Sequence, residues 1–270
     1  METGAGPLRI EGLWKSYNGL EVLRGIDLEV AGRNILCVLG PSGCGKTTLL
    51  NIISGMVKPD AGRILGLEHP LVSYVFQEPR LLPWKTVKGN IEFVLKDRMQ
   101  KQEREAIVRR TMEMVELSDF ALYYPARLSG GMKQRVAAAR AFAFPSRLLL
   151  MDEPFRALDL KLKLQLIASF MAVWSRTRRT VVFVTHDITE AVLMGDEIVV
   201  LSERPARVIE KLVNPLAREE RSIENTASLT LEKTLYRLIL SDQKAGGPPL
   251  DGRPPGPARS RGGGPEQGAP

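Results

Sequence analysis

The chain has 270 residues, is 44% hydrophobic and carries a formal net charge of +7. That length can hold one large α/β domain or two small ones around a sizeable core. No apolar run is long enough to cross a bilayer, and residues 1–12 lack the charged-then-apolar pattern of a secretory signal. A membrane role would therefore need a separate partner. The positive charge is compatible with a nucleic-acid or anionic-membrane partner, but a basic surface with an arginine-containing tail is the simpler explanation.

Strand-like and loop-like segments alternate in the first third of the chain. Asn18-Gly19 is a turn signal between two expected strands. The next apolar run is continuous, as expected for a strand buried on both faces of a sheet, and it leads through a glycine-rich loop into a helix expected to begin at 48–53. The strands expected in this part cover residues 8–13, 22–30, 35–39 and 71–76.

The sequence changes character after residue 83. Up to residue 120 it is charged and favours helix, and one set of residues recurs there at helical spacing, which indicates a packing face. That set is Ile107, Thr111, Met114 and Val115. Apolar, β-rich runs return at 148–151, 181–185 and 198–201, and they predict further core strands with helices between them. From Lys244 onward, 15 of 27 residues are Gly or Pro, so we expect this tail to be disordered.

The loop GPSGCGKTT after the buried strand matches the phosphate-loop pattern GxxxxGK[ST]. Glycines let successive backbone N–H groups turn inward around phosphates, and the helix N-terminus adds the positive end of its dipole. Lys46 is expected to reach the β- and γ-phosphates of ATP, and the Thr47 hydroxyl to bind Mg²⁺. A chance glycine-rich turn is disfavoured by the strand before the loop and the helix after it. The residues expected to contact nucleotide here are Gly40, Pro41, Ser42, Gly43, Cys44, Gly45, Lys46, Thr47 and Thr48.

The two cysteines lie in different segments, Cys37 in the apolar run and Cys44 in the loop. Neither placement suits a disulfide, which favours a reducing compartment. The Lys46 ammonium and the helix N-terminus both favour a thiolate, so we expect Cys44 to be more reactive than Cys37. The alternative is that Cys44 only fills a small space in the loop.

Two carboxylates, Asp152 and Glu153, follow the apolar run 148–151. They are therefore expected at the carboxyl end of a buried strand, where open α/β sheets bind their ligands. Asp152 would hold Mg²⁺ through water, and Glu153 would act as general base on the attacking water. A pair of exposed capping acids is the alternative, which the nearby phosphate loop disfavours because it supplies a use for both.

The segment LSGGMKQR, residues 128–135, resembles the signature of the ATP-binding cassette (ABC) family. In that family each subunit completes the ATP site of its partner. The resemblance therefore implies a head-to-tail homodimer, in which Ser129, Gly130 and Gly131 of one copy face the γ-phosphate held by the other. The match extends over about residues 8–215.

Four more segments match motifs of this family. Tyr17 stands where an aromatic ring stacks on adenine, and Gln77 matches a glutamine that contacts Mg²⁺ and the attacking water. His186 matches the switch histidine near the γ-phosphate, and Ala157-Leu158-Asp159 matches the loop that crosses the dimer interface. The implied catalytic residues are Glu153, His186, Gln77 and Lys46, and the implied metal-binding residues are Thr47, Gln77 and Asp152. Order is the strongest support, since the motifs follow the family's sequence order at Tyr17, Lys46, Gln77, Ser129, Asp152 and His186.

The resemblance also implies an architecture. It is an α/β phosphate-loop (P-loop) NTPase fold with a RecA-like core, a small antiparallel β region and a helical subdomain inserted at about 83–140. The nucleotide-binding domain is expected over 1–215, a C-terminal helical extension over 216–243 and the tail over 244–270. The stretch 62–76 is shorter than usual and suggests a trimmed antiparallel hairpin. Arg156 stands in DEPFRALD where such sequences usually have Gly, and it lies beside the loop that crosses the interface.

Three longer segments narrow the resemblance to importers. FQEPRLLPWKTV, LLLMDEPF and THDITEAVLMGDEIVVLSERPARV are similar to ATPases that import nitrate, sulfonates and taurine. This implies ATP and Mg²⁺ as cofactors, integral membrane permease subunits driven through residues 77–84 and, indirectly, an external substrate-binding protein. It implies a peripheral position on the cytoplasmic face of the inner membrane and no nucleic-acid partner.

Soluble ABC ATPases are the competing class. Those that act in DNA repair separate the nucleotide motifs by a long coiled coil, and this chain has no such run between residues 48 and 148. Translation factors carry two cassettes in tandem, and this chain has one. An accessory ATPase of iron–sulfur assembly stays open as an alternative, because the importer-like segments argue less decisively against it.

Overall fold

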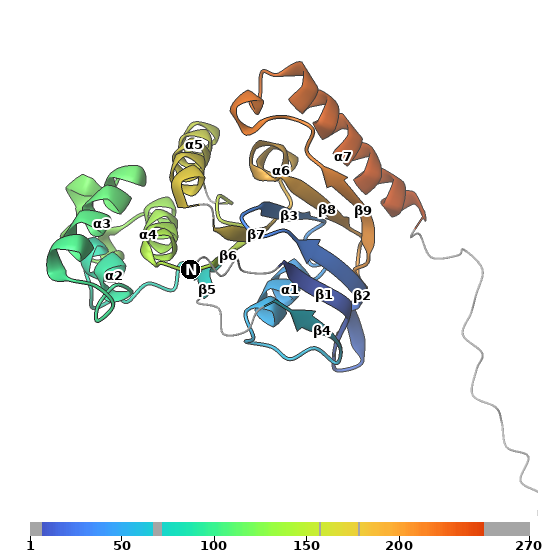
Figure 1. Cartoon of the computed structure of the whole chain (residues 1–270), viewed down its shortest axis with the longest axis horizontal. Coiled ribbons are helices and arrows are strands. Elements are labelled where there is room, and N and C mark those ends of the chain that lie inside the picture. The colour runs from blue at the N-terminus through green and yellow to red at the C-terminus, as the bar shows by residue number, and fades with distance from the viewer. Residues whose placement is uncertain (1–6, 67–71, 157, 178, 246–270) are drawn as a thin grey trace, which may run out of the picture.

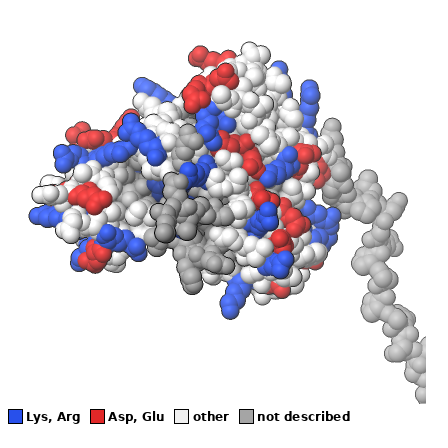
Figure 2. Space-filling model, viewed as in Figure 1, with Lys and Arg blue, Asp and Glu red and all other residues white. Residues whose placement is uncertain are grey.

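The computed structural model describes residues 7–66, 72–156, 158–177 and 179–245, with side chains to 242. Of the tail expected to be disordered, residues 246–270 lie outside this range, as does Ala157 of the expected interface loop. None of the described helices is both long and apolar enough to span a membrane. Figure 2 shows positive and negative side chains interspersed over the visible face, so the net charge is not gathered there.

A mixed sheet forms the centre of the described chain (Figure 1). Its five parallel strands are β5 (Val72–Val75), β6 (Leu148–Asp152), β7 (Thr180–Thr185), β3 (Ile35–Leu39) and β8 (Glu197–Leu201), in that spatial order, and β9 (Val208–Val213) adds antiparallel to β8. Strands β3 and β6 are buried at every residue. They are continuous apolar runs because a parallel sheet is covered on both faces. The predicted core strands are confirmed, whereas β9 was not predicted because it is half exposed and polar.

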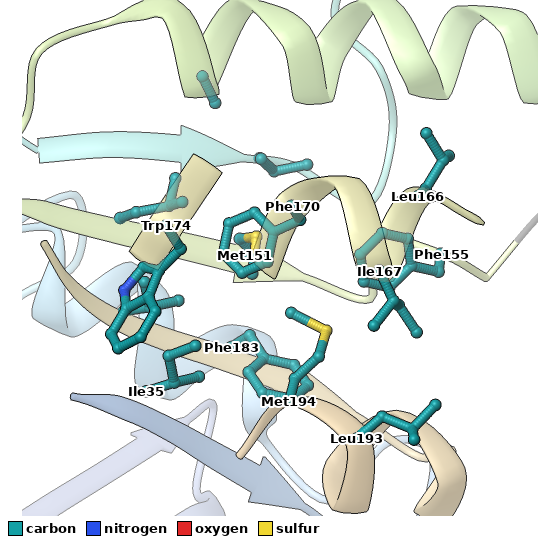
Figure 3. Close-up of a cluster of buried hydrophobic side chains, with 14 of the residues drawn as sticks. Ile35, Met151, Phe155, Leu166, Ile167, Phe170, Trp174, Phe183, Leu193 and Met194 are labelled. Carbon is teal, nitrogen blue, oxygen red and sulfur yellow. The ribbon is translucent and has the colours of Figure 1, made fainter. Parts of the chain in front are cut away.

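Helices cover both faces of this sheet. Helix α1 (Lys46–Ile53) packs on one face against β6 and β7, while α6 (Ile188–Met194) lies on the other. Alternate residues of β3 therefore enter separate cores, with Cys37 in one and Val38 in the other. Figure 3 shows the first core, where Phe170 and Trp174 of α5 (Leu160–Thr177) lie over Met151 and Phe183.

A second, antiparallel sheet has the order β2–β1–β4 within the described residues. Its strands are β1 (Leu8–Tyr17), β2 (Leu20–Val30) and β4 (Ala61–Leu65). Asn18 and Gly19 both have positive φ, 50° and 80°, as a two-residue hairpin turn requires. This confirms the predicted turn and gives β1 a greater length than expected.

The predicted hairpin over 62–76 is wrong. β4 pairs with β1, whereas β5 pairs in parallel with β6 of the central sheet. The two strands also differ in burial, since Ser73 and Val75 of β5 are buried while β4 is mostly exposed. Residues 67–71, between them, lie outside the described range.

A group of helices stands apart from the sheet at the left of Figure 1. It consists of α2 (Val87–Phe93), α3 (Lys101–Met114), the short 3-10 turns Ser118–Phe120 and Pro125–Arg127, and α4 (Gly130–Ala143). The predicted packing face is confirmed, since Thr111 and Val115 are buried and Ile107 and Met114 pack against the same core. Helix α4 joins this group to the sheet through β5.

The C-terminal part of the described chain closes the other end of the sheet. A 3-10 turn at Arg218–Glu220 precedes α7 (Thr226–Ala245), which packs against α6, β8 and β9. Asp196 anchors the connection, because it accepts two hydrogen bonds from Arg218 (2.8 and 2.7 Å) and one from Arg221 (3.1 Å). It also accepts one from the backbone N–H of Ile35, which ties the segment to β3.

Candidate functional site

The loop between β3 and α1 has the backbone that its glycines predict. Gly43 and Gly45 have φ of 77° and 122°, a region that other L-residues rarely adopt. A Cβ atom on Gly45 would lie 2.8 Å from Cγ1 of Val22. Glycine is therefore required at this position both by the turn and by the close approach of β2.

The ammonium of Lys46 lies across this loop. Its Nζ donates hydrogen bonds to the carbonyl oxygens of Gly40 and Pro41, each at 2.8 Å, and the residue is 5% exposed. Among the described residues, Lys46 forms no ion pair with a carboxylate. Its positive charge therefore remains available to an anion that enters the loop.

The carboxyl ends of three neighbouring strands bring the remaining predicted residues to the same edge of the sheet. Asp152 pairs with Val184 across β6 and β7, so Glu153 and His186 follow these strands at adjacent positions. Gln77 follows β5 on the other side of β6 and is exposed. The backbone N–H of Gly40, at the end of β3, donates to the carbonyl of Thr185 (3.4 Å), which places the phosphate loop beside the same edge.

Asp152 is buried at the end of β6, with 3% of the residue exposed. Burial raises the pKa of its carboxyl, while a hydrogen bond from Thr47 acts in the opposite direction. The hydroxyl of Thr47 and the carboxylate of Asp152 thus meet next to the phosphate loop. Both are oxygen donors of the kind that Mg²⁺ prefers. No group of three or more His, Cys, Asp or Glu side chains able to hold a metal occurs in the described ranges.

Glu153 is held by contacts on both sides of its carboxylate. Nδ1 of His186 lies 3.1 Å from Oε1, and Nη1 of Arg156 lies 3.1 Å from Oε2. The second contact is one of charge alone, since Oε2 accepts no hydrogen bond. The backbone of Glu153 has a φ of 46°, which is unusual for a residue with a side chain. Only 8% of its side chain is exposed, against 44% for His186 and 56% for Arg156.

A buried polar cluster supports the loop that carries His186. Nζ of Lys163, on α5, lies 2.5 Å from Oδ2 of Asp187 and 2.9 Å from Oε1 of Glu190. The hydroxyl of Thr185 donates to Oε2 of Glu190 (2.7 Å). Sequence reasoning missed this cluster, because Lys163 is 24 residues from Asp187 and only the fold joins them. The one available signal was Asp187 before the apolar helix, where it caps α6.

The acids of this cluster differ in environment. Burial raises the pKa of Glu190, and the hydrogen bonds from Thr185 and Lys163 oppose this without cancelling it. Burial also acts to raise the pKa of Asp187, but hydrogen bonds from Lys163 and from the backbone N–H of Glu190 outweigh it, so that pKa is lowered. The single positive charge of Lys163 is therefore shared by two carboxylates, and one of them, Glu190, is almost fully buried.

Tyr17 ends β1 and is 43% exposed, with Nζ of Lys15 5.3 Å from its ring centroid. Strand β2 of the same hairpin contributes Val22 and Leu23, whose side chains lie against Gly45. The ring of Tyr17 thus projects from the hairpin that packs on the phosphate loop.

The predicted signature residues lie away from the phosphate loop of their own chain. Ser129 is the N-cap of α4, and its hydroxyl accepts a hydrogen bond from the N–H of Met132 (3.3 Å). Within the described ranges, no hydrogen bond joins residues 129–131 to residues 40–48, and α4 packs against α2, α3 and β5. Ser129 and Gly130 are exposed. Asp159 is exposed too, and its carboxylate accepts from the N–H of Leu162 at the start of α5.

The expectation that Cys44 is a reactive thiol is wrong. The residue is 1% exposed, and burial raises the pKa of its thiol even though the Lys46 charge acts to lower it. The ammonium is directed instead at the carbonyls of Gly40 and Pro41. Cys44 fills space beneath the loop, which was the alternative. Cys37 is fully buried and burial raises its pKa well above the usual value, as its strand predicts. Both cysteines are free.

Comparison with known proteins identifies the family. The ABC transporter family model matches residues 23–156. The taurine import ATP-binding protein TauB of Yersinia pestis is 42% identical over 213 residues, which cover 76% of this chain and 83% of that protein. The chain belongs to the ABC transporter family. TauB of Pseudomonas putida is 44% identical over 217 residues, covering 76% of this chain and 82% of that protein.

Solved ABC cassettes have the same fold. The dimeric post-hydrolysis structure of the ATP-binding cassette MJ0796, bound to ADP and Pi, superimposes with a TM-score of 0.69 at 29% identity. It covers 78% of this chain and all of that one. The predicted P-loop NTPase fold is thereby confirmed, and the chain is an ATP-binding ABC ATPase.

Proposed function

We propose that this ABC ATPase is the ATP-hydrolysing subunit of an importer that energises uptake of a small nutrient anion of the taurine, sulfonate or nitrate class. The relatives named as taurine import ATP-binding proteins support the importer assignment. The observation that carries the catalytic part is the meeting of Lys46, Asp152, Glu153 and His186 at one edge of the central sheet.

The phosphate loop and the residues around it would bind the nucleotide. Backbone N–H groups of residues 40–48 and the Lys46 ammonium would bind the phosphates, and Tyr17 would stack on the adenine. Thr47 and Asp152 would hold Mg²⁺, with Gln77 adding an amide oxygen from the end of β5. The ion, when bound, neutralises negative charge on the phosphates.

Glu153 would position the attacking water. A carboxylate can only accept hydrogen bonds, so in its contact with ionised Glu153 the Nδ1 of His186 carries the hydrogen. This fixes the tautomer and leaves Nε2 for a second partner near the γ-phosphate. His186 would therefore orient the base and sense the phosphate at the same time.

A second copy of the chain would complete each site. Ser129, Gly130 and Gly131 are on the helical subdomain, out of contact with their own phosphate loop, which favours a head-to-tail homodimer in which they face the partner's ATP. The dimeric state of MJ0796 supports this arrangement. ATP binds the closed dimer more tightly than the open one, and this difference is the energy that can bias a transporter.

An exposed apolar surface on the helical subdomain suits the permease. Trp84 is 70% exposed and Leu122 is 77% exposed. Two backbone hydrogen bonds, from Val87 to Tyr123 and from Lys88 to Ala121, join the two segments that carry them. Because large exposed apolar side chains gather at interaction sites, we place an integral membrane permease here. The ATPase would then lie peripherally on the cytoplasmic face of the inner membrane and act indirectly with an external substrate-binding protein.

Isolation from membranes followed by reconstitution tests this function. The tagged chain should co-purify with an integral membrane protein, and vesicles containing both should hydrolyse ATP faster when the cognate binding protein and taurine are added. A neutral sugar in place of taurine is the control. Recovery without any integral membrane protein, or uptake that does not depend on ATP, would contradict the importer assignment.

A further inference from the structure

Arg156 forms an ion pair with the proposed general base, and no step of the proposed function uses it. Its Nη1 lies 3.1 Å from Oε2 of Glu153 in the same chain. The pair joins an exposed guanidinium, 56% accessible, to a carboxylate that is only 8% accessible. An exposed cation that lies against a buried functional carboxylate can control what else reaches that carboxylate.

A tight turn dictates this contact. The backbone N–H of Arg156 donates to the carbonyl oxygen of Glu153 (3.3 Å), and Phe155 between them is buried at 2% exposure. With the turn anchored by Phe155, the side chain three residues after Glu153 lies back over its carboxylate. Glycine, which the family resemblance of the sequence leads us to expect at this position, has no side chain and could not make the contact.

Oε2 of Glu153 accepts no hydrogen bond and is shielded from solvent, so an attacking water does not reach it in this arrangement. Oε1 faces His186 and Oε2 faces Arg156, each at 3.1 Å. A general base must hold the attacking water within hydrogen-bond reach. Withdrawal of the guanidinium would uncover Oε2, the oxygen that has no hydrogen bond, for this water.

We propose that Arg156 is a positioning residue that restrains Glu153, so that hydrolysis proceeds only when the guanidinium leaves Oε2. This inference rests on the proposed role of Glu153 as the general base. The restraint acts on the chemical step and not on nucleotide binding, because the contact of Arg156 is with the carboxylate. It limits the ATP that the ATPase consumes by itself.

Steady-state ATPase kinetics of three variants of the full chain test the restraint. Arg156→Gln removes the charge at similar length, and kcat should rise about 3-fold with KM for ATP unchanged, the modest size expected from opening a partly exposed ion pair. Arg156→Lys keeps the charge and should give an intermediate kcat. Arg9→Gln is the matched control, because Arg9 pairs with Glu29 at 3.2 Å on an exposed surface outside the site, and its kcat should equal that of the wild type.

The double variant Glu153→Gln/Arg156→Gln separates this inference from the proposal beneath it. If Glu153 is the base, Glu153→Gln is nearly inactive and adding Arg156→Gln does not accelerate it. An unchanged or reduced kcat for Arg156→Gln, or a change confined to KM, would overturn the restraint while leaving the base assignment intact. Wild-type hydrolysis by Glu153→Gln alone would instead overturn the base. Equal melting temperatures for Arg156→Gln and Arg9→Gln show that both variants fold alike.

Discussion

At the scale of single residues, the site depends on one buried carboxylate with an unusual backbone. Glu153 has a φ of 46° and its N–H donates to the carbonyl of Val184 (3.0 Å), which binds it to β7. A positive φ for a residue with a side chain costs about 1 kcal/mol or more. Such a cost persists where the surrounding structure fixes the residue, here through β7, His186 and the turn to Arg156.

Replacing this carboxylate by an amide should separate binding from chemistry. We expect Glu153→Gln to bind MgATP as the wild type does but to hydrolyse it at least about 100-fold more slowly, because an amide cannot accept the proton of the attacking water. Equilibrium binding of a fluorescent ATP analogue and phosphate release measure the two properties. Lys46→Ala is the contrasting variant and should lose affinity. Equal hydrolysis by Glu153→Gln and wild type would refute the assignment.

The burial of both thiols has a direct chemical consequence. Because burial raises the pKa values of Cys37 and Cys44, neither should react quickly with maleimide at neutral pH. We expect less than one label per chain in the native protein and two after unfolding in guanidinium, counted by intact-mass spectrometry. Rapid labelling of native Cys44 would show that the phosphate loop opens far more than this structure does.

At the scale of elements, the edge of the sheet is held in place by helices α5 and α6. Lys163 of α5 reaches two acids on the segment that carries His186, and Glu190 among them is 2% exposed. Removing one partner of a buried pair leaves an uncompensated charge, which costs far more than losing an exposed pair. The position of the histidine is thus linked to the packing of α5.

Lys163→Met should lower the free energy of unfolding by about 3 kcal/mol, the size seen when a buried ion pair loses one member. Lys161→Met is the control on the same helix, because Lys161 is exposed and should change stability little. Urea unfolding followed by circular dichroism measures both. Equal midpoints for the two variants would show that the cluster contributes nothing to stability.

The same cluster predicts a pH dependence. The pKa of Asp187 is lowered in the folded chain, so its contribution to stability is present above its unfolded pKa and is lost as the pH falls through the folded value. The pKa of Glu190 is raised by burial, so Glu190 acts in the opposite sense. Its own contribution to stability is present below its unfolded pKa and is lost as the pH rises through the folded value. In Lys163→Met the lowering of the Asp187 pKa should disappear, so stability should fall less between neutral and acidic pH than in the wild type. The free energy of unfolding, measured at a series of pH values, tests this. An equal fall toward acidic pH in the variant and the wild type would contradict it.

At the scale of the whole molecule, the two proposed halves of the ATP site do not meet within one chain. The phosphate loop lies on the core, while Ser129 is on α4 of the helical group, whose described contacts with the sheet run through β5 (Figure 1). A functional site would therefore require the phosphate loop of one copy and the Ser129 region of another copy. This requirement makes the oligomer, and not the single chain, the unit in which hydrolysis should be measured.

Mixed dimers of two inactive variants test this arrangement. Ser129→Arg damages the signature and Lys46→Ala damages the phosphate loop, so a mixed dimer contains one intact composite site and one doubly damaged site. We expect the mixture to hydrolyse ATP faster than the sum of the separate variants. Differently tagged subunits establish that mixed dimers form, and no gain despite their formation would count against the head-to-tail arrangement.

The sequence alone determined the central strands and the phosphate loop. Continuous apolar runs at 35–39 and 148–151 are typical of strands buried on both faces of a sheet, and the glycine spacing after the first of them fits a loop of fixed backbone. Asp152 and Glu153 could be placed at a strand end for the same reason. These features are local, so neighbouring residues suffice to encode them.

Only the tertiary structure decided which side chains meet across long separations. The membership of β4 and β5 in different sheets, the burial of Cys44, and the cluster of Lys163 with Asp187 and Glu190 all depend on packing between distant segments. Arg156 and Glu153 are only three residues apart in the sequence, yet their contact needs the buried Phe155 to anchor the turn. Burial shifts the pKa of a thiol, and packing decides which charged groups become neighbours. Both depend on how distant segments of the chain pack together, which the local order of residues does not specify.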